Sequence, residues 1–418
     1  MPIEENEVLT TGKPIIPRMT PGNLIINNSE HMARIKKIRE QMNRSRIAAL
    51  YLTNPTRILY TTGFSHISTE RPLALIIPQK DSIFMLGPHL EEDHVKADAP
   101  LIQEFISYPD YPGTAHPLRQ FARVLKQRGL ANSKIATDSP DGAAGGWGYR
   151  GPSLKEILPL AKIVNGKDIV DNLRLMKSKQ EIRLLRESAR WAERAHDILM
   201  EKLTPGVHDA IAGVEASYEA LTRMLKKLGT RYRQLRWGLS PVVVGCRGQV
   251  GPESAIPHAV FSPRKVRKGD VLVTEAGVEV GGYTSELERT VIIGKPGQKE
   301  KKYFDAMLKA QEAALDSFKP GIPCSQVDTA ARTAIQKAGL SKALRHHVGH
   351  GIGIDGHEPP WLDPGETTIM KTGMVFSCEP GLYVPGMAGF RHSDTVEITS
   401  RGMALITHYP RSLEALTI

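Results

Sequence analysis

The sequence predicts an α/β domain followed by an α+β domain. Its 418 residues exceed what one hydrophobic core usually organises, which favours two domains. Short apolar runs alternate with helical patterns in the first part, whereas longer strand patterns and helices mix in the remainder. We expect an extended arm over residues 1–28, an α/β domain over 29–173 and an α+β domain over 174–418.

The composition is that of a globular protein without a membrane span. Hydrophobic residues make up 40% and charged residues 24%, and no apolar run approaches the roughly 18 residues that cross a bilayer. The N-terminus lacks the basic start and the apolar stretch of a secretory signal, so we expect a cytoplasmic protein. Three cysteines occur without any C-x-x-C pattern, which argues against a disulfide framework or a thiolate zinc site.

The net charge of +10 raises the question of an acidic partner such as nucleic acid. The basic residues are dispersed, however, and no basic run is interleaved with aromatic residues as a single-strand binder needs. We therefore do not expect nucleic-acid binding and favour a small-molecule or dipeptide substrate.

The first domain shows helical and strand patterns in alternation. Apolar residues at helical spacing predict a helix over residues 29–43, and the Gly- and Pro-rich segment 139–153 predicts a loop. Short apolar runs predict buried strands over 46–53, 73–78, 82–87, 134–138 and 161–166.

The second domain opens on the longest helical pattern of the chain, residues 177–203, which the Pro205-Gly206 pair ends. Two further helices are predicted over 303–318 and 325–339. Long strand patterns lie between and after these helices, which is typical of an α+β domain rather than of a wound parallel sheet.

Residues 269–294 predict a β-hairpin that gathers carboxylates on one face. A glycine pair separates two strand-like runs, which is a strong signal for a two-residue turn. In that register Glu275 faces Glu288 directly, and Glu286 lies diagonal to Glu275 on the same side of the sheet. Three such charges repel one another unless a cation binds or a carboxyl group stays protonated. The alternative is an exposed strand face on which the charges are solvated.

A glycine-rich segment further on is unusually rich in histidine. It contains His346, His347, His350 and His357, and Glu358 follows directly. Imidazoles in a glycine-rich loop suit metal binding or proton transfer, although a single histidine is more often structural.

Two more candidates lie outside the hairpin and the histidine-rich segment. Glu379 follows such a run and precedes a Pro-Gly turn, and a carboxylate where a strand enters a loop is well placed to serve a site. His258 lies in a loop before the hairpin, where a solvated surface histidine is the first interpretation.

Taken in order, these segments resemble the pita-bread peptidase and creatinase family, which includes Xaa-Pro dipeptidases, aminopeptidases and creatinase. The resemblance covers most of the chain and rests on ERPLALIIP, KSKQEI, the hairpin, GHGIG with His357 and Glu358, SCEPGLYVPG and GFRHSDTVEIT. It implies a creatinase-like α/β N-terminal domain, a pita-bread C-terminal catalytic domain and a homodimer.

Comparison with the peptidases of this family implies an altered metal site. They hold two ions with two aspartates, a histidine and two glutamates, and the matching positions here are Glu275, Glu286, His350 and Glu379, with Ser393 in place of the last glutamate. A hydroxyl replaces a bridging carboxylate poorly. The resemblance therefore implies either no metal or one divalent ion of manganese, iron, cobalt or zinc.

Comparison with the creatinase branch implies a set of roles without a metal. His258 would be the general acid and base, Glu288 and Glu379 would bind the substrate, and Arg71 would bind its carboxylate group. Trp361 stands where creatinase has a second substrate-binding arginine, which argues against creatine as the substrate.

The leading hypothesis is a hydrolase that cleaves a C–N bond, in an amide, amidine or peptide, of a small carboxylate-bearing substrate. His350 and His357 would stabilise the charge that develops on the substrate, while His258, Glu288 and Glu379 have the roles given above. Trp361, Tyr383 and Arg391 would complete the substrate pocket with Arg71. A metal-dependent Xaa-Pro dipeptidase or aminopeptidase is the near alternative, and an inactive pita-bread protein that binds RNA or the ribosome is an alternative of another class.

Overall fold

The computed structural model describes residues 24–142, 149–236 and 240–418, which form two compact units. The first unit contains, among the described residues, Ile47–Thr53 and those of Ser68–Val164. The second unit contains the remaining described residues, including two N-terminal stretches that precede and follow the first strand. Residues 1–23 of the predicted extended arm lie outside the described residues.

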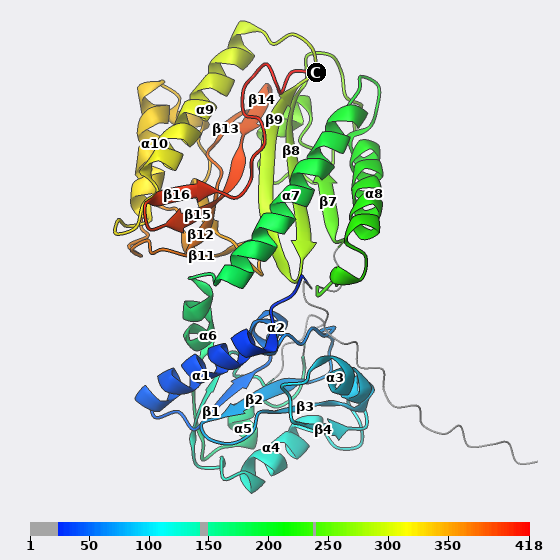
Figure 1. Cartoon of the computed structure of the whole chain (residues 1–418), viewed down its shortest axis with the longest axis vertical. Coiled ribbons are helices and arrows are strands. Elements are labelled where there is room, and N and C mark those ends of the chain that lie inside the picture. The colour runs from blue at the N-terminus through cyan, green and yellow to red at the C-terminus, as the bar shows by residue number, and fades with distance from the viewer. Residues whose placement is uncertain (1–23, 143–148, 237–239) are drawn as a thin grey trace, which may run out of the picture. The chain divides into compact units, whose positions relative to one another are not determined.

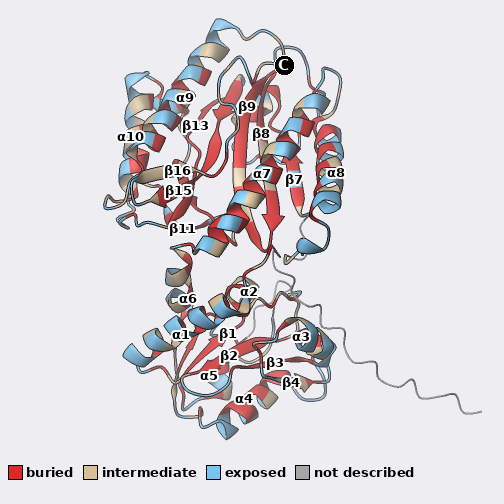
Figure 2. Cartoon of the chain, viewed as in Figure 1, coloured by how far each residue is buried: buried red, intermediate tan, exposed pale blue. Residues whose placement is uncertain are grey.

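The first unit is built on a six-stranded mixed sheet in the order β4-β3-β2-β1-β5-β6. β1 pairs in parallel with β5 and β3 with β4, whereas β1, β2 and β3 pair antiparallel. The strands β1, β2 and β3 are buried (Figure 2). Tyr51 on β1, Phe84 on β3 and Phe121 on α4 belong to one hydrophobic core. The elements are β1 (Ala49–Leu52), β2 (Ala74–Pro78), β3 (Phe84–Pro88), β4 (Glu104–Tyr108), β5 (Lys134–Thr137), β6 (Lys162–Asn165), α3 (Glu92–Asp98), α4 (Pro117–Gln127) and α5 (Leu154–Ile157).

All five strands predicted for this domain are confirmed to within a few residues. The sequence reading missed β4, because its five residues are only half-buried and show no continuous apolar run. Residues 143–148 of the predicted loop lie outside the described residues.

The second unit is an antiparallel sheet covered by pairs of helices (Figure 1). Eight strands form the main sheet in the order β11-β10-β12-β15-β9-β8-β7, with β16 paired to β15, and β13 and β14 form a separate ribbon. α7 packs across β8 and β9, α8 packs against α7 and β7, and α9 pairs with α10. The predicted α+β class is therefore confirmed.

The helices of the second unit are α1 (Asn28–Arg44), α2 (Pro55–Thr62), α6 (Lys167–Arg174), α7 (Lys179–Lys202), α8 (Asp209–Leu228), α9 (Gln298–Ser317) and α10 (Ser325–Lys337). Its strands are β7 (Val242–Gly245), β8 (Val271–Val280), β9 (Tyr283–Ile292), β10 (Gly349–Gly351), β11 (Glu358–Trp361), β12 (Val375–Cys378), β13 (Gly381–Val384), β14 (Ala388–Arg391), β15 (Ser393–Thr399) and β16 (Gly402–Leu405).

The start of α7 shows how the sequence fixes a helix end. The Ser178 hydroxyl accepts a hydrogen bond from the Glu181 amide at 3.2 Å, and the Glu181 carboxylate accepts one from the Ser178 amide at 2.8 Å. This reciprocal pair satisfies two amide groups that a helix terminus would otherwise leave without partners. The other end lies at Lys202, just before the Pro-Gly pair that was predicted to end it.

The hairpin of β8 and β9 has the predicted register. Gly281 and Gly282 have φ angles of 59° and 88°, as a two-residue hairpin turn requires. Glu275 pairs directly with Glu288, and Glu286 lies opposite Gly277, one position along the same face. The carboxylates therefore project from one side of the sheet, as the glycine pair indicated.

Replacing Gly281 by alanine is expected to lower the free energy of unfolding by about 2 kcal/mol or more. The new Cβ atom would lie 2.3 Å from the Leu24 carbonyl oxygen at a residue with positive φ. Gly206→Ala is the matched control, because Gly206 also has positive φ but no atom lies within 4 Å of the place that its new Cβ atom would take. Chemical denaturation of both variants measures the effect, and equal losses would contradict the steric part of the argument.

His31 makes the second unit sensitive to acid. Its ring is buried between α1 and α2, where Nδ1 lies 3.1 Å from the Tyr60 carbonyl oxygen, and burial together with the nearby Arg34 charge lowers its pKa to about 3. Because the unfolded chain protonates near pH 6.5, the stability that neutral His31 contributes is present above that pH and is lost as the pH falls towards 3. We expect a loss of about 1.5 kcal/mol between pH 6.5 and 5. Denaturation curves of His31→Gln should show a shallower pH dependence over this range, and an unchanged slope would contradict the assignment.

Candidate active site

Neighbouring strands of the main sheet bring the predicted site residues together. The order β10-β12-β15-β9-β8 places five consecutive strands side by side, although they come from distant parts of the chain. Glu275 lies on β8, Glu286 and Glu288 lie on β9, His350 lies on β10, and Glu379 follows β12 directly. The expectation that His350 lies in a loop is wrong, because Gly349, His350 and Gly351 form the short strand β10. The backbone of neighbouring strands lies so close to both glycines that larger side chains would not fit there.

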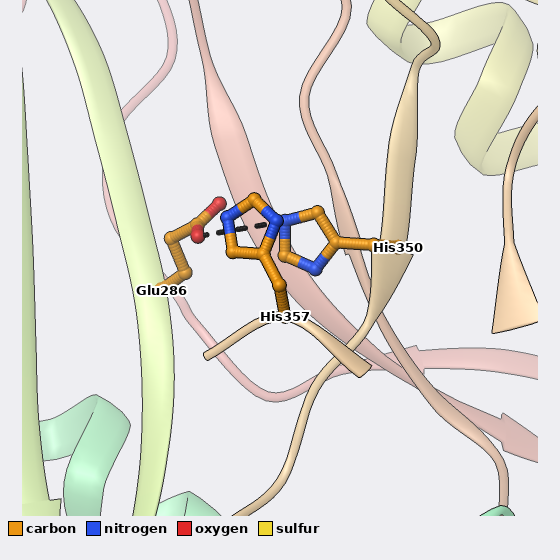
Figure 3. A group of neighbouring side chains, drawn as sticks. All are labelled: Glu286, His350 and His357. Carbon is orange, nitrogen blue, oxygen red and sulfur yellow. Dashed lines mark ion pairs between the residues drawn. The ribbon is translucent and has the colours of Figure 1, made fainter. Parts of the chain in front are cut away.

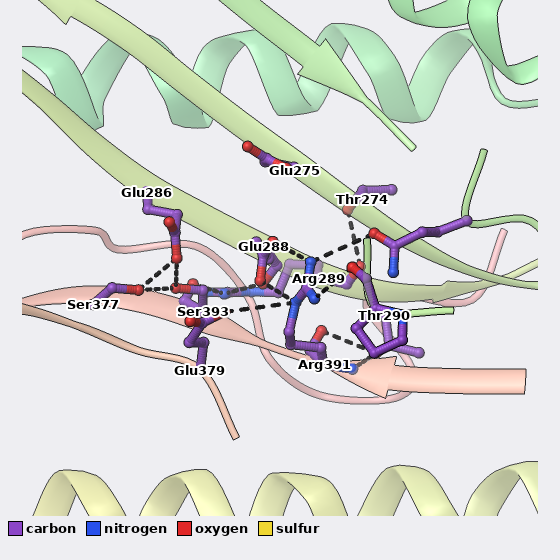
Figure 4. Close-up of polar contacts among 12 residues, drawn as sticks. Thr274, Glu275, Glu286, Glu288, Arg289, Thr290, Ser377, Glu379, Arg391 and Ser393 are labelled. Atoms are coloured by element: carbon purple, nitrogen blue, oxygen red, sulfur yellow. Dashed lines mark hydrogen bonds and ion pairs between the residues drawn. The ribbon is translucent and has the colours of Figure 1, made fainter. Parts of the chain in front are cut away.

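Glu288 is bound by Arg391 in the interior of the cluster (Figure 4). Both side chains are only 3% exposed, and the Arg391 guanidinium donates to both carboxylate oxygens, from Nη2 at 2.5 Å and also from Nε. Burial and the neighbouring carboxylates raise the pKa of Glu288, whereas the Arg391 charge opposes this shift and favours the ionised carboxylate that its two hydrogen bonds hold. The alternative of a solvated strand face is therefore wrong for Glu288.

Glu379 and His350 form a second charged pair. His350 Nε2 lies 3.4 Å from Glu379 Oε1, and His350 Nδ1 donates to the Gly351 carbonyl oxygen at 3.0 Å. Burial alone would lower the pKa of His350, but the ion pair with Glu379 and the nearby Glu286 charge raise it to about 9. Burial would raise the pKa of Glu379, but the ion pair with His350 and the Arg391 charge lower it to about 2. The pair is therefore an imidazolium beside a carboxylate.

Glu286 is held by hydroxyl groups. Ser377 and Ser393 donate to its Oε1 at 2.5 Å and 2.7 Å, and its Oε2 lies 3.8 Å from His350 Nε2 (Figures 3 and 4). Ser393 stands where the resemblance implied a glutamate, and it donates a hydrogen bond to the Glu286 carboxylate. The sequence reading gave Ser377 no role, although it is the first residue of the SCEPGLYVPG segment that was singled out.

Glu275 pairs with Arg247, which the sequence reading also missed. Arg247 Nε lies 2.5 Å from Glu275 Oε2, and Arg247 Nη2 lies 3.9 Å from Glu288 Oε1. Burial raises the pKa of Glu275 and the Arg247 charge opposes that rise. The carboxylate cluster indicated that a counter-charge is needed, but nothing in the sequence indicated that Arg247, in the turn that follows β7, provides it.

Aromatic side chains surround His350. The His357 ring stacks on His350 with centroids 3.7 Å apart and planes at 19°, and burial and the His350 charge lower the pKa of His357 (Figure 3). The Trp361 ring meets His350 edge-on at 6.4 Å. The Tyr383 hydroxyl accepts from Arg391 at 3.0 Å and contacts His346 Nε2 at 2.8 Å.

Three predicted residues have other surroundings. His258 is exposed in a turn, where its neighbour Pro257 accepts a hydrogen bond from Arg391 Nη1 at 3.3 Å. Arg71 belongs to the first unit and pairs there with Glu70 and Asp110 at 2.7 Å and 3.1 Å. Glu358, which was counted with the histidines, is buried and bound by Lys177 Nζ at 2.6 Å and by Arg174, so its observed contacts are structural.

The residues present do not fit a centre of two metal ions. Arg247 occupies one oxygen of Glu275, Arg391 occupies both oxygens of Glu288, and Ser393 offers a hydroxyl where a bridging carboxylate would be needed. A metal ligand must present free lone pairs, whereas both oxygens of Glu288 already accept hydrogen bonds from Arg391 and Oε2 of Glu275 lies against the Arg247 guanidinium. One ion fits better in donor type and spacing. Among the described residues, ligand atoms lie within 4.8 Å of one another in two groups, Glu286 with His350 and His357, and Glu286 with Glu288 and Glu379.

The fold and the cluster together define a hydrolase with the pita-bread fold and a creatinase-like N-terminal domain. Residues 183–400 match the model of metallopeptidase family M24, and residues 34–176 match that of the creatinase/prolidase N-terminal domain. Because the first match alone spans more than half of the sequence, the chain belongs to metallopeptidase family M24. The family resemblance and the enzyme class predicted from the motifs are confirmed.

Similar proteins align over nearly the whole chain. The Xaa-Pro dipeptidase of Pyrococcus horikoshii is 27% identical over 382 residues, which cover 91% of this chain and 98% of the relative. The solved prolidase from Thermococcus sibiricus is 28% identical with a TM-score of 0.79, covering 94% of this chain and all of that chain. The solved Xaa-Pro dipeptidase from Bacillus anthracis is 26% identical with a TM-score of 0.76, covering 93% and 100% respectively.

Within the described residues, every helix is too short or too polar to cross a membrane.

Proposed function

We propose that this M24 hydrolase cleaves a C–N bond of a small carboxylate-bearing substrate by protein side chains alone. The observation that carries the proposal is the charge balance of the cluster, in which guanidinium and imidazolium groups already neutralise Glu275, Glu288 and Glu379. Such a cluster provides fixed charges that do not need to reorganise during the reaction.

Each step of the proposed reaction uses a group of this chain. His258 accepts a proton from water as the oxygen attacks the carbon of the C–N bond, and it returns that proton to the leaving nitrogen. His350, charged through its pairing with Glu379, lies where it can stabilise negative charge on the substrate oxygen or amidine nitrogen. His357, neutral and stacked on His350, borders the same space, and Glu288 and Glu379 orient the substrate.

A cleft lies at the Glu275 end of the cluster. It encloses about 470 Å³ between α8 and β7 and is lined by Arg247 and Glu275, whereas His258, His350 and Glu379 are not among its lining residues. Its walls are mainly apolar, with Val214, Tyr218 and Phe261 among them. A pocket of this size suits a small organic molecule rather than a folded partner.

The test combines metal analysis with a substrate screen. Protein purified without added ions is treated with a chelator and assayed on amides, cyclic and open amidines, guanidino acids and Xaa-Pro dipeptides, with release of the amine as the readout. Turnover that survives chelation supports the proposal, and stoichiometric manganese, iron, cobalt or zinc that is required for turnover would sink it. An identified substrate whose turnover is unchanged in His258→Ala would remove the acid-base role of His258.

A metal-dependent Xaa-Pro dipeptidase is the second candidate. It is favoured by the ligand group of Glu286, His350 and Glu379 or His357 and by the similarity to proteins described as Xaa-Pro dipeptidases. It predicts that only Xaa-Pro dipeptides are cleaved, and only after a divalent ion is added.

We also propose that the protein acts as a cytoplasmic homodimer. Light scattering after size exclusion measures the mass of the native protein, for which twice the 46.1 kDa of one chain is expected.

We further propose that Arg71 binds the carboxylate group of the substrate. Arg71→Met should then raise KM with little change in kcat, because the arginine binds the substrate but takes no part in the chemical step.

A further inference from the structure

We propose that Arg247 is a built-in cation that supplies the charge for Glu275 and keeps divalent ions out of that half of the cluster. The proposal concerns the chain's own side chains and does not depend on which substrate is cleaved.

Three carboxylates of the cluster each lie next to a different cationic side chain. Glu288 has Arg391, and Glu379 has His350, but neither cation lies within ion-pair distance of Glu275. Arg247 is the group that meets Glu275, with its Nε 2.5 Å from Oε2. Apart from this ion pair, that oxygen is buried and, within the described part of the chain, accepts no hydrogen bond. Loss of Arg247 would therefore leave Glu275 with a buried charge open to another cation.

The backbone around Arg247 is shaped to hold it there. Arg247 has a φ angle of 49°, and among the described residues it shares a positive φ only with Arg46 and with glycines. A residue with a β-carbon adopts this conformation at a cost, so the surrounding structure must impose it. The Gly248 amide donates to Asp209 Oδ2 at 2.9 Å and the Gln249 amide donates to the Cys246 carbonyl at 2.8 Å, which fixes the turn.

The turn follows a strand whose register is fixed against β8. Gly245, the last residue of β7, pairs directly with Glu275 on β8. The turn therefore starts beside Glu275, and a side chain two residues further on reaches back over the carboxylate. The turn packs tightly at Gly248, where a β-carbon would lie 2.3 Å from the backbone of Phe261. This close contact fixes the position of the turn.

The consequence for metal binding follows from Coulomb repulsion. A divalent ion bound to Glu275 would lie within a few ångströms of a guanidinium that stays protonated at every accessible pH. Arg247 also approaches Glu288 at 3.9 Å, so its charge acts on both carboxylates of the directly paired positions. The site is thus built for one added divalent ion at most, bound through Glu286 and His350 and away from Glu275.

The test counts metal ions and needs no substrate. Wild type, Arg247→Gln and Arg247→Lys are stripped with a chelator, titrated with Mn²⁺, and analysed by calorimetry, by the shift in melting temperature and by elemental analysis of the washed protein. We expect at most one ion per chain in the wild type and in Arg247→Lys. In Arg247→Gln we expect one additional ion per chain, or Mn²⁺ affinity at least tenfold tighter than in the wild type.

Three further outcomes decide whether Arg247 excludes the second ion. The double variant Arg247→Gln with Glu275→Gln should lose the additional ion, because the carboxylate that binds it is gone. Two ions bound by the wild-type chain, or an Arg247→Gln variant that binds Mn²⁺ as the wild type does, would overturn the proposal. The wild-type measurement decides even if the variants fail to fold, and since no step uses turnover, failure of the proposed C–N hydrolysis leaves these results unaffected.

Discussion

Replacement of Arg289 by methionine is expected to destabilise the protein by about 3–5 kcal/mol, enough to prevent folding at moderate temperature. Arg289 is fully buried, and its guanidinium donates to Asp394 Oδ1 at 2.8 Å and to the carbonyl oxygens of Glu288, Ser393, Tyr409 and Pro410. Methionine fills much of the volume but removes the cationic partner of the buried Asp394 carboxylate, which keeps only the neutral donors Thr407 and Gln311, and it removes the donor that four carbonyl groups share.

Arg186→Met is the matched control for this prediction. Arg186 also pairs with a carboxylate, that of Glu397 at 2.9 Å, but its side chain is 55% exposed. Removing an exposed pair should change the free energy of unfolding by less than about 1 kcal/mol. Urea denaturation of the two variants compares the buried with the exposed arginine, and similar losses in both would show that the Arg289 network contributes little.

Glu379→Gln is expected to lower kcat by about two to four orders of magnitude on any substrate found in the screen. The change keeps the shape of the side chain but removes the charge that pairs with His350 at 3.4 Å and lies 3.8 Å from Arg391. His350 then loses the partner that keeps it charged, and the cluster loses a fixed charge beside the reacting bond. Steady-state kinetics at saturating substrate measure the change.

The control for this variant is another buried glutamate with an arginine partner. Glu181 lies on α7, 3.3 Å from Arg34, and accepts a hydrogen bond from the Tyr283 hydroxyl at 2.8 Å. We expect Glu181→Gln to lower the melting temperature while leaving kcat within about twofold, since general destabilisation does not change the chemical step of the folded fraction. A Glu379→Gln enzyme with wild-type kcat would remove Glu379 from the proposed mechanism.

Local signals in the sequence were sufficient to predict the hairpin and its carboxylates. The glycine pair required positive φ at both positions, and the period of two along each strand then fixed which residues share a face. Glu275, Glu286 and Glu288 could be placed together for this reason, without knowledge of the rest of the sheet.

The partners of these carboxylates could not be predicted in the same way. Arg247, Ser377 and Ser393 lie on strands or turns that become neighbours of β8 and β9 only through long-range pairing. Nothing in the local pattern of GCRGQVG distinguishes Arg247 from a solvated surface arginine. Contacts of this kind depend on strand order, which periodicity along one segment does not contain.

The strand order of the main sheet separates the scaffold of the site from its chemistry. The ladder hydrogen bonds between β10, β12, β15, β9 and β8 use backbone groups, so a change of side chain at Ser393 or Glu286 leaves the positions of its neighbours in place. Enzymes that share this backbone can therefore carry a metal ligand, a hydroxyl or a guanidinium at the same point of the sheet, so that the fold alone does not determine whether the reaction needs an ion.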